Sequence, residues 1–185
     1  LRPELTPTLA RMIASKQNEL IFPCRWWSFG PFWRYERPQK GRTREFYQWN
    51  IDLIGSDEVA ADAELIAVAA EFFRSVGVRP DQVKILINDR RLMDAQLSRI
   101  GIPADLKPAV LRMIDRIDKQ PPDVWDANTR ALGVNPQQLV ALRSLLDNCE
   151  LWQQSDDLKA LFAGLDALGV REYTAYEPKI IRGLD

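Results

Sequence analysis

Residues 32–52 hold the side chains of this sequence that are best suited to binding an anion. They read FWRYERPQKGRTREFYQWNID, two aromatic, strand-like runs around a loop that supplies Arg37, Lys40, Arg42 and Arg44. The planar fork of an arginine binds phosphate oxygens through two parallel hydrogen bonds. The stretch therefore predicts a site for a polyphosphate ligand or, alternatively, for the phosphate backbone of an RNA.

The two runs that flank this loop, residues 24–36 and 45–55, are expected to pair as strands. Side chains alternate between the faces of a strand, so one face of the second run carries Phe46, Gln48, Asn50 and Asp52. The opposite face carries Tyr47, Trp49, Ile51 and Leu53. On the first run, Phe32, Arg34 and Glu36 are expected to lie on the same face of the hairpin as Phe46, Gln48, Asn50 and Asp52. We expect the polar face to bind a ligand that has a phosphate end and a planar ring, and the apolar face to pack on helices.

This pattern also has an ordinary interpretation, in which a basic hairpin loop is solvated and the alternating polar residues face water. The composition narrows the remaining choices. The net charge of the 185-residue chain is −1, so contact with a nucleic acid would have to come from a local patch. Histidine is absent, which excludes Ser-His-Asp and Cys-His catalysis within this chain. Two cysteines, Cys24 and Cys149, are too few for a disulfide framework or a zinc site, and no metal site is expected.

The remaining sequence predicts a mixed α+β fold. Thr6 is expected to cap a first helix with Pro7 at its first position, and a second helix is expected to end at Gly77. The run 83–89 is expected to be a buried strand, and residues 90 to about 169 have a helical pattern broken by prolines. Residues 171–185 return to strand character. The predicted division is 1–99 for a first sheet part, 100–155 for a helical insertion and 156–185 for the return to the sheet.

Several motifs resemble those of one family. FWRYERPQKGRTREFYQ resembles motif 2 of class II aminoacyl-tRNA synthetases, in the form found in histidyl-tRNA synthetases. RPELT near the start resembles the histidine-binding element of that family, and IIRGLD at the end resembles the start of its RGLDYY signature. INDRRLMD and DLKALFAGLDALGV resemble the archaeal and eukaryote-like branch. These motifs occur in the family's order and cover nearly the whole chain.

The resemblance implies a class II antiparallel sheet of about six strands, flanked by helices, that binds ATP with its Mg²⁺ and histidine. By position, Arg34, Glu36, Arg42 and Phe46 correspond to ATP-binding residues, with Arg34 on the α-phosphate and Phe46 stacked on the adenine. The residues that correspond to histidine-binding positions are Glu4, Leu5, Thr6, Arg34, Gln48, Asp52 and Arg182. Asp52 would bind the imidazole, although bacterial-type members mostly have Glu there. Arg34 and Arg182 would be the catalytic groups, because they place positive charge where two anions meet.

Other parts of the chain, and what would lie outside it, leave alternatives open. Lys107, Arg112, Arg116 and Lys119 have helical spacing within the expected insertion, which suits a solvated face or a contact with the tRNA(His) acceptor end. The other function considered is that of the synthetase-like regulatory subunit of ATP phosphoribosyltransferase, which senses histidine. A free-standing RNA-binding hairpin would not explain RPELT or RGLD.

The resemblance also gives expectations for the whole protein. No segment has the roughly 18 apolar residues that span a membrane, and no signal peptide is visible, so a cytoplasmic enzyme is expected. The first residue is Leu1, and we interpret the chain as an internal piece of a homodimeric synthetase. Motifs 1 and 3 of the family would lie outside it, so we expect the isolated piece to be inactive.

Arg182→Ala in the full-length protein should cut histidine-dependent ATP–pyrophosphate exchange by at least about 10², the scale of losing one transition-state donor. Histidine binding should weaken less, because the charge that Arg182 would stabilise develops only during the reaction. Exchange kinetics beside equilibrium binding of histidine check this. Near-normal exchange in the variant would remove Arg182 from the mechanism.

Overall fold

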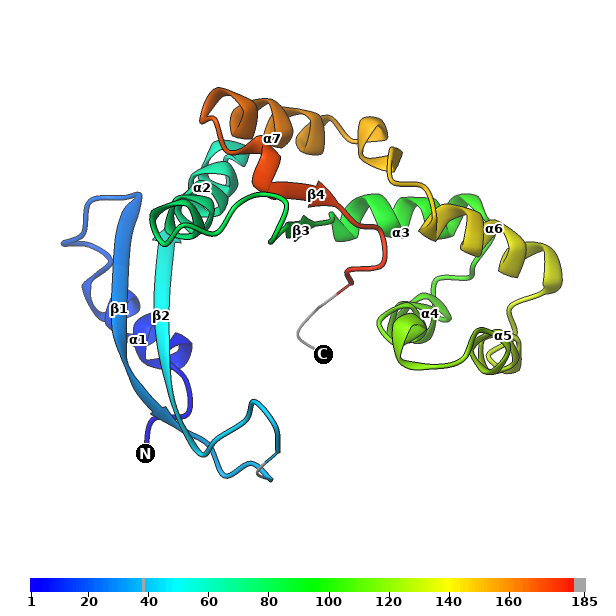
Figure 1. The fold of residues 1–185 in the computed structure, drawn as a ribbon, viewed down its shortest axis with the longest axis horizontal. Coiled ribbons are helices and arrows are strands. Elements are labelled where there is room, and N and C mark those ends of the chain that lie inside the picture. The colour runs from blue at the N-terminus through cyan, green and yellow to red at the C-terminus, as the bar shows by residue number, and fades with distance from the viewer. Residues whose placement is uncertain (38, 182–185) are drawn as a thin grey trace. The chain divides into compact units, whose positions relative to one another are not determined.

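The computed structural model describes residues 1–37 and 39–181. The chain forms two compact units, which we call the hairpin unit (Leu1–Ala61) and the helical unit (Asp62–Asp185). Figure 1 shows the long strand pair of the first and the succession of helices of the second. Among the described residues, no helix is both long enough and apolar enough to cross a membrane.

The hairpin unit is built on two ten-residue strands, β1 (Cys24–Trp33) and β2 (Glu45–Ile54). They pair antiparallel without a break, from Cys24 opposite Ile54 to Trp33 opposite Glu45. Aromatic residues favour such strands because large rings pack well on a pleated surface. The predicted pairing is confirmed, but β1 ends at Trp33, three residues before the expected end. Arg34 and Glu36 therefore lie beyond the regular strand.

Helix α1 (Thr6–Lys16) precedes the strands, and its start differs from the expectation. Leu5, not Thr6, takes the N-cap position, and no side chain caps the helix. The Leu5 carbonyl accepts from the backbone N–H groups of Thr8 and Leu9, both at 2.9 Å, so the helix begins one residue earlier. The Thr6 hydroxyl is therefore not used as a helix cap.

The expectation that the apolar face of the hairpin packs on helices is wrong for this chain. Trp27, Phe29, Tyr47 and Trp49 are 72%, 66%, 62% and 45% exposed. The Phe29 and Tyr47 rings stack on each other with their centroids 5.5 Å apart. Helix α1 has no buried residue, so it does not supply the missing cover. On the other face of β1, Cys24, Gly30 and Phe32 are buried, and Trp26 and Ser28 are half-buried.

The helical unit holds most of the core. Its helices are α2 (Val59–Ser75, which begins in the hairpin unit), α3 (Arg90–Arg99), α4 (Lys107–Ile114), α5 (Pro122–Ala131), α6 (Pro136–Leu146) and α7 (Asp156–Ala167). Short 3₁₀ turns η1 (Ile117–Lys119), η2 (Leu151–Gln154) and η3 (Arg171–Tyr173) connect some of them. The largest fully buried side chain, Trp125, donates its ring N–H to the Met113 carbonyl at 2.7 Å and so ties α5 to α4.

A short parallel strand pair lies within this unit. β3 (Ile85–Ile87) pairs with β4 (Thr174–Tyr176), and all helices from α3 to α7 lie in the crossover between them. Parallel strands need such a crossover, because a tight turn cannot return the chain in the same direction. Both strands are shorter than the runs 83–89 and 171–185 that the sequence predicts as strands. Residues 182–185 lie outside the described part of the chain.

The first strand pair and the second are separate two-stranded sheets among the described residues. The expected antiparallel sheet of about six strands is therefore not seen among the described residues, which form one antiparallel pair and one parallel pair. Tyr176 of β4 is buried, and this burial raises the pKa of its hydroxyl above the ordinary value. The parallel pair is therefore anchored in the core of the helical unit.

Candidate functional site

The polar face of the hairpin is a row of facing residue pairs. In the register of β1 and β2, Phe32 lies opposite Phe46, Gly30 opposite Gln48, Ser28 opposite Asn50 and Trp26 opposite Asp52. Phe46, Gln48, Asn50 and Asp52 are all half-buried, whereas Tyr47 and Trp49 between them are exposed. The alternation predicted for β2 is seen in the burial of Glu45 to Asn50, whereas Ile51 and Leu53 are half-buried as Asp52 is. The row from Phe46 to Asp52 is roughly 20 Å long, since a strand rises about 3.3 Å per residue.

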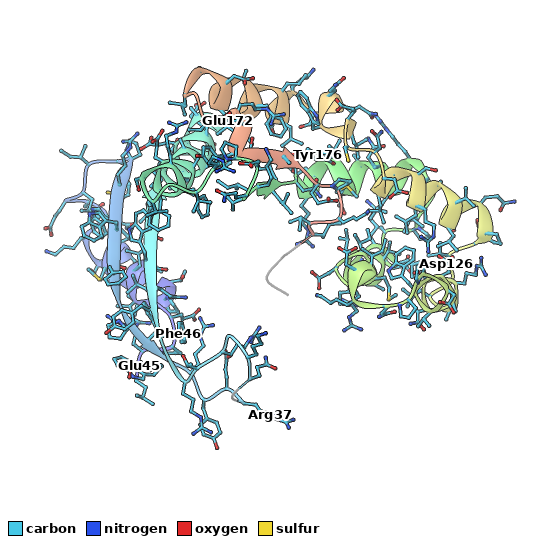
Figure 2. The ribbon with its side chains drawn as sticks, viewed as in Figure 1. Arg37, Glu45, Phe46, Asp126, Glu172 and Tyr176 are labelled. Carbon is cyan, nitrogen blue, oxygen red and sulfur yellow. The ribbon has the colours of Figure 1, made fainter. Side chains whose placement is uncertain are left out.

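Arg34 stands at the loop end of this row, where the guanidinium contacts several groups. Its Nε donates to the Pro3 carbonyl at 2.8 Å, and its guanidinium carbon lies 5.0 Å from the centre of the Phe46 ring. The Phe46 ring also stacks on Phe32, with centroids 6.2 Å apart. Figure 2 shows Phe46 near the start of β2, where the loop ends. One arginine and one aromatic ring that were assigned to ATP are thus in contact.

Glu36 lies between two arginines. Its carboxylate is 3.9 Å from Arg34 Nη1 and 3.3 Å from Arg42 Nη1. The pairing of Glu36 with Arg34, which the sequence left open beside an adenine contact, is therefore present. Exposed ion pairs of this kind are weak, contributing about 0–1 kcal/mol, so a ligand can rearrange them at little cost. The four residues assigned to ATP form one cluster: Arg34, Glu36, Arg42 and Phe46.

The N-terminal segment lies along the free edge of β1. The Trp33 backbone N–H donates to the Arg2 carbonyl at 3.0 Å, and Arg2 Nη2 donates to the Pro31 carbonyl at 2.7 Å. The Arg2 guanidinium lies 4.6 Å above the centre of the Phe32 ring. A side-chain carbon added at Gly30 would come within 3.0 Å of Arg2, so glycine leaves the room that this arginine occupies. Arg2 is a positioning residue that the sequence did not single out.

The loop that carries the basic residues has a tight turn at its tip. The Arg42 N–H donates to the Gln39 carbonyl at 2.9 Å, and Gly41 between them has φ +78°, which favours glycine. Arg37 is exposed near the tip (Figure 2). Arg44 lies over the ring of Tyr35, 4.7 Å from its centre, so it stabilises the base of the loop. This turn reverses the direction of the chain, so the Arg42 side chain can contact the Glu36 carboxylate.

The residues assigned to histidine binding are farther from one another than those assigned to ATP. Gln48 and Asp52 lie on the polar face, about 13 Å apart along β2. Glu4 and Thr6 are exposed and Leu5 is half-buried, in the segment that Arg2 and Arg34 hold against the hairpin. The catalytic assignment of Arg182 lies outside the described residues. The structure thus brings the ATP set together and divides the described residues of the histidine set between the polar face, the N-terminal segment and Arg34.

Asn50 shares this face and had no role from the sequence. Its side-chain Nδ2 is buried without a hydrogen-bond partner among the described residues. Buried polar groups nearly always have a partner, and leaving one unsatisfied costs about 1–3 kcal/mol. In the sequence, the one sign that Asn50 belongs to the site is its position between Gln48 and Asp52 on the same strand face. In the described part of the chain, no group of three or more acidic, cysteine or histidine side chains could hold a metal ion.

Comparison with known proteins identifies the family. A family model described as histidyl-tRNA synthetase matches residues 1–184. The chain belongs to the histidyl-tRNA synthetase family.

The relatives agree with this assignment over the whole chain. The histidine–tRNA ligase of Arabidopsis thaliana, described as chloroplastic/mitochondrial, is 35% identical over the full chain, which covers 40% of that protein. The histidine–tRNA ligases of Haloarcula marismortui and Halobacterium salinarum are 35% and 37% identical, and the chain covers 46% and 45% of their lengths. The chain therefore spans less than half the length of the curated relatives it matches. The resemblance to archaeal members agrees with the archaeal relatives found.

Solved structures show the fold. Histidyl-tRNA synthetase from Nostoc superposes on the whole chain with a TM-score of 0.83 at 22% identity, and the chain covers 46% of it. A protein from Bacillus halodurans described as an ATP phosphoribosyltransferase regulatory subunit/histidyl-tRNA synthetase gives 0.80 at 19% identity. The chain covers half of that protein. The predicted class II synthetase fold is confirmed.

Arg34→Lys should weaken binding of Mg·ATP to the full-length protein about tenfold. Lysine keeps the positive charge but loses the planar fork that can hold the Pro3 carbonyl and a phosphate oxygen together. Isothermal titration calorimetry measures the change.

The matched control is Arg44→Lys, because Arg44 lies over Tyr35 at the base of the same loop. It should change the affinity by less than about twofold. Equal losses in the two variants would mean that only the net charge of the loop matters.

Proposed function

We propose that the full-length protein is a histidine–tRNA ligase that activates L-histidine with ATP and transfers it to tRNA(His). The cluster of Arg34, Glu36, Arg42 and Phe46 at one end of a polar strand face carries this proposal. It combines cationic forks for phosphates with an aromatic ring for a base, and Gln48 and Asp52 continue the same face. The family assignment supports it independently.

The chemistry needs charge more than covalent catalysis. The histidine carboxylate attacks the α-phosphorus of ATP, and pyrophosphate leaves, so two anionic groups must approach each other. Arg34 would bind oxygens of the α-phosphate while its Nε stays on the Pro3 carbonyl. Arg182 would act on the same charge. Mg²⁺ enters bound to ATP and neutralises part of the phosphate charge. No histidine or cysteine nucleophile is required, which agrees with a chain that has no histidine.

Asp52 supplies the selectivity in this proposal. A carboxylate that accepts a hydrogen bond from the imidazole N–H is left unpaired by an amino acid that lacks such a donor. Sites of this kind reject the wrong substrate by roughly 10⁴–10⁵. Gln48, together with Glu4, Leu5 and Thr6 of the N-terminal segment, would bind the α-amino end of histidine. Arg2 and Arg34 fix the backbone of that segment against the hairpin, so its groups can be oriented.

The partners follow from the same proposal. The tRNA acceptor end would meet the basic loop at Arg42, the full-length enzyme would be a homodimer, and its compartment would be the cytoplasm. Residues 100–155, which include α4, α5 and α6, would be the helical insertion. Within it, Lys107 lies 3.7 Å from Asp94 and Lys119 lies 2.9 Å from Asp115. These ion pairs favour a structural role for both lysines over a contact with tRNA.

The alternative is a histidine-sensing regulatory subunit of ATP phosphoribosyltransferase. The Bacillus halodurans protein, whose description includes such a regulatory subunit, has a similar fold, so the fold alone does not separate the two functions. Such paralogues generally lose the motif 2 loop, whereas here the loop folds with Glu36 against Arg34 and Arg42. We therefore favour the ligase.

The full-length protein should catalyse ATP–pyrophosphate exchange that depends on histidine, and it should charge tRNA(His).

In the same exchange assay, Asp52→Ala should raise the KM for histidine at least about tenfold more than the KM for ATP, because only the imidazole end loses its partner.

Asp52→Asn is the matched control, since it keeps the size of the side chain and one acceptor oxygen. Its KM for histidine should lie between those of the wild type and the alanine variant. Equal effects of Asp52→Ala on both substrates would make Asp52 structural. Histidine binding without any exchange would favour the regulatory subunit.

A further inference from the structure

Arg2 contacts three consecutive residues of β1. Its backbone carbonyl accepts from the Trp33 N–H at 3.0 Å, and its Nη2 donates to the Pro31 carbonyl at 2.7 Å. Its guanidinium carbon lies 4.6 Å from the centre of the Phe32 ring. The residue is therefore held through its backbone and its side chain at once. Because hydrogen bonds are directional, these contacts fix the orientation of the chain at Arg2 as well as its position.

The ring beneath Arg2 belongs to a larger stack. Phe32 is 1% exposed and stacks on Phe46, with the ring centroids 6.2 Å apart. Arg34 lies over Phe46 at 5.0 Å from the ring centre. A planar guanidinium can lie flat on an aromatic ring, which the ammonium group of a lysine cannot do. The same pair of rings thus sets the places of Arg2 and of the arginine assigned to the α-phosphate.

Gly30 leaves the space that the Arg2 guanidinium occupies. A side-chain carbon at this buried position would come within 3.0 Å of Arg2 Nη2, so the arginine would have to move. Gly30 is not among the glycines with a positive φ, so its backbone conformation is open to other residues. The missing side chain therefore serves the arginine and not the path of the backbone.

The segment after Arg2 is short and is held at the next residue as well. The Pro3 carbonyl accepts from Arg34 Nε at 2.8 Å, and Thr6 is the first residue of α1. Glu4 lies between these points, and its Cα atom can be at most about 7 Å from that of Arg2. A displacement of Arg2 therefore displaces Glu4 and the start of α1, the groups assigned to the α-amino end of histidine.

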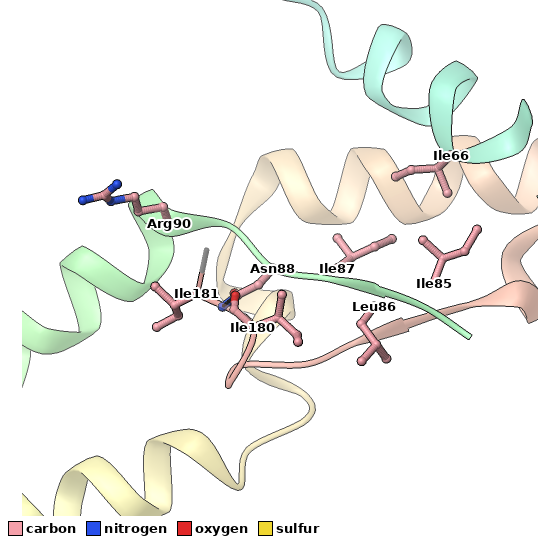
Figure 3. Close-up of a pocket in the computed structure, with 8 residues that line it drawn as sticks. All are labelled: Ile66, Ile85, Leu86, Ile87, Asn88, Arg90, Ile180 and Ile181. Carbon is pink, nitrogen blue, oxygen red and sulfur yellow. Dashed lines mark hydrogen bonds between the residues drawn. The ribbon is translucent and has the colours of Figure 1, made fainter. Parts of the chain in front are cut away.

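A pocket in the helical unit does not suit an α-amino group. It has a volume of about 350 Å³, and most of its lining is apolar (Figure 3). The residues that line it are Ile66, Ile85, Leu86, Ile87, Asn88, Arg90, Ile180 and Ile181. None of these has a carboxylate, and the positive charge of Arg90 repels an ammonium group. Glu4 in the hairpin unit is the better partner for such a group.

We propose that Arg2, in the space left by Gly30, sets the selectivity of the protein for ligands that carry an α-amino group. This inference rests on the proposed function, in which Glu4 and Thr6 bind that group. Arg2 does not touch the ligand and is a positioning residue that acts through the backbone of the segment. An ammonium group binds only oxygen atoms at hydrogen-bond distance, so a displaced segment loses the α-amino end while Asp52 keeps the imidazole.

Isothermal titration calorimetry of the full-length protein with three ligands tests the proposal. Histidine and histidinol carry the α-amino group, and 3-(imidazol-4-yl)propionate lacks it. Arg2→Ala should weaken the binding of the first two about tenfold, the scale of one or two lost hydrogen bonds, and change that of the third by less than about twofold. Arg2→Lys should give the same selective loss if the alanine variant does not fold, because lysine cannot both lie flat on Phe32 and donate to Pro31.

Gly30→Ala displaces the same guanidinium by a second route. It should weaken histidine binding about threefold in the wild-type background, because the added methyl group pushes Arg2 away from the Pro31 carbonyl. In the Arg2→Ala background it should have no effect on histidine binding, since the group that it displaces is gone.

Arg11→Ala is the matched control. Arg11 is also an exposed arginine of the N-terminal region, but its guanidinium donates to the Thr8 hydroxyl of its own helix at 3.2 Å. Its loss should leave all three affinities within about twofold of the wild type.

Three results would overturn the proposal: unchanged histidine binding in Arg2→Ala, equal weakening of all three ligands by that variant, or an equal loss from Arg11→Ala. An effect of Gly30→Ala that persists in the Arg2→Ala background would overturn it as well. A wild-type protein without histidine-dependent ATP–pyrophosphate exchange would instead overturn the proposed function.

Discussion

The antiparallel pairing of β1 with β2 is the constraint on which the candidate site depends. Ten consecutive residue pairs fix which side chains share a face, and a slip of one residue would turn every polar side chain to the other face. The register places Phe32 opposite Phe46 and so creates the aromatic surface on which both Arg2 and Arg34 lie. The two arginines in turn hold the N-terminal segment by hydrogen bonds that involve Pro31 and Pro3. Strand register thus positions groups from two parts of the sequence.

The two faces of this hairpin have different consequences. The polar face has a buried Phe32, half-buried polar residues and the N-terminal segment at its edge. The other face exposes Trp27, Phe29, Tyr47 and Trp49, an amount of apolar surface that soluble proteins rarely leave in one place. Since the chain spans less than half the length of its relatives, part of the full-length protein is a candidate to cover that face.

The sequence predicts the features that depend on local chemistry. Alternation of aromatic and polar residues gave the hairpin and the composition of its faces, and a left-handed Gly77 ends α2 as expected, at φ +79°. The features that it did not predict depend on partners far away in the chain. Helix α1 starts at Thr6 because the Leu5 carbonyl accepts its first hydrogen bonds, and no side chain caps it. The short β3 is limited by the three residues of β4 that it pairs with. Asn88 bonds to residues about ninety positions later, a relation that no spacing in the sequence reveals.

In the proposed function, one ligand on the polar face reaches from the Arg34 cluster to Asp52. A crystal structure of the full-length protein with a stable analogue of histidyl-adenylate tests it most directly. We predict that the Arg34 guanidinium binds the group that replaces the α-phosphate and that the Asp52 carboxylate accepts a hydrogen bond from the imidazole, with the analogue along β2. An analogue bound away from this face, or one whose imidazole lies out of reach of Asp52, would contradict the account.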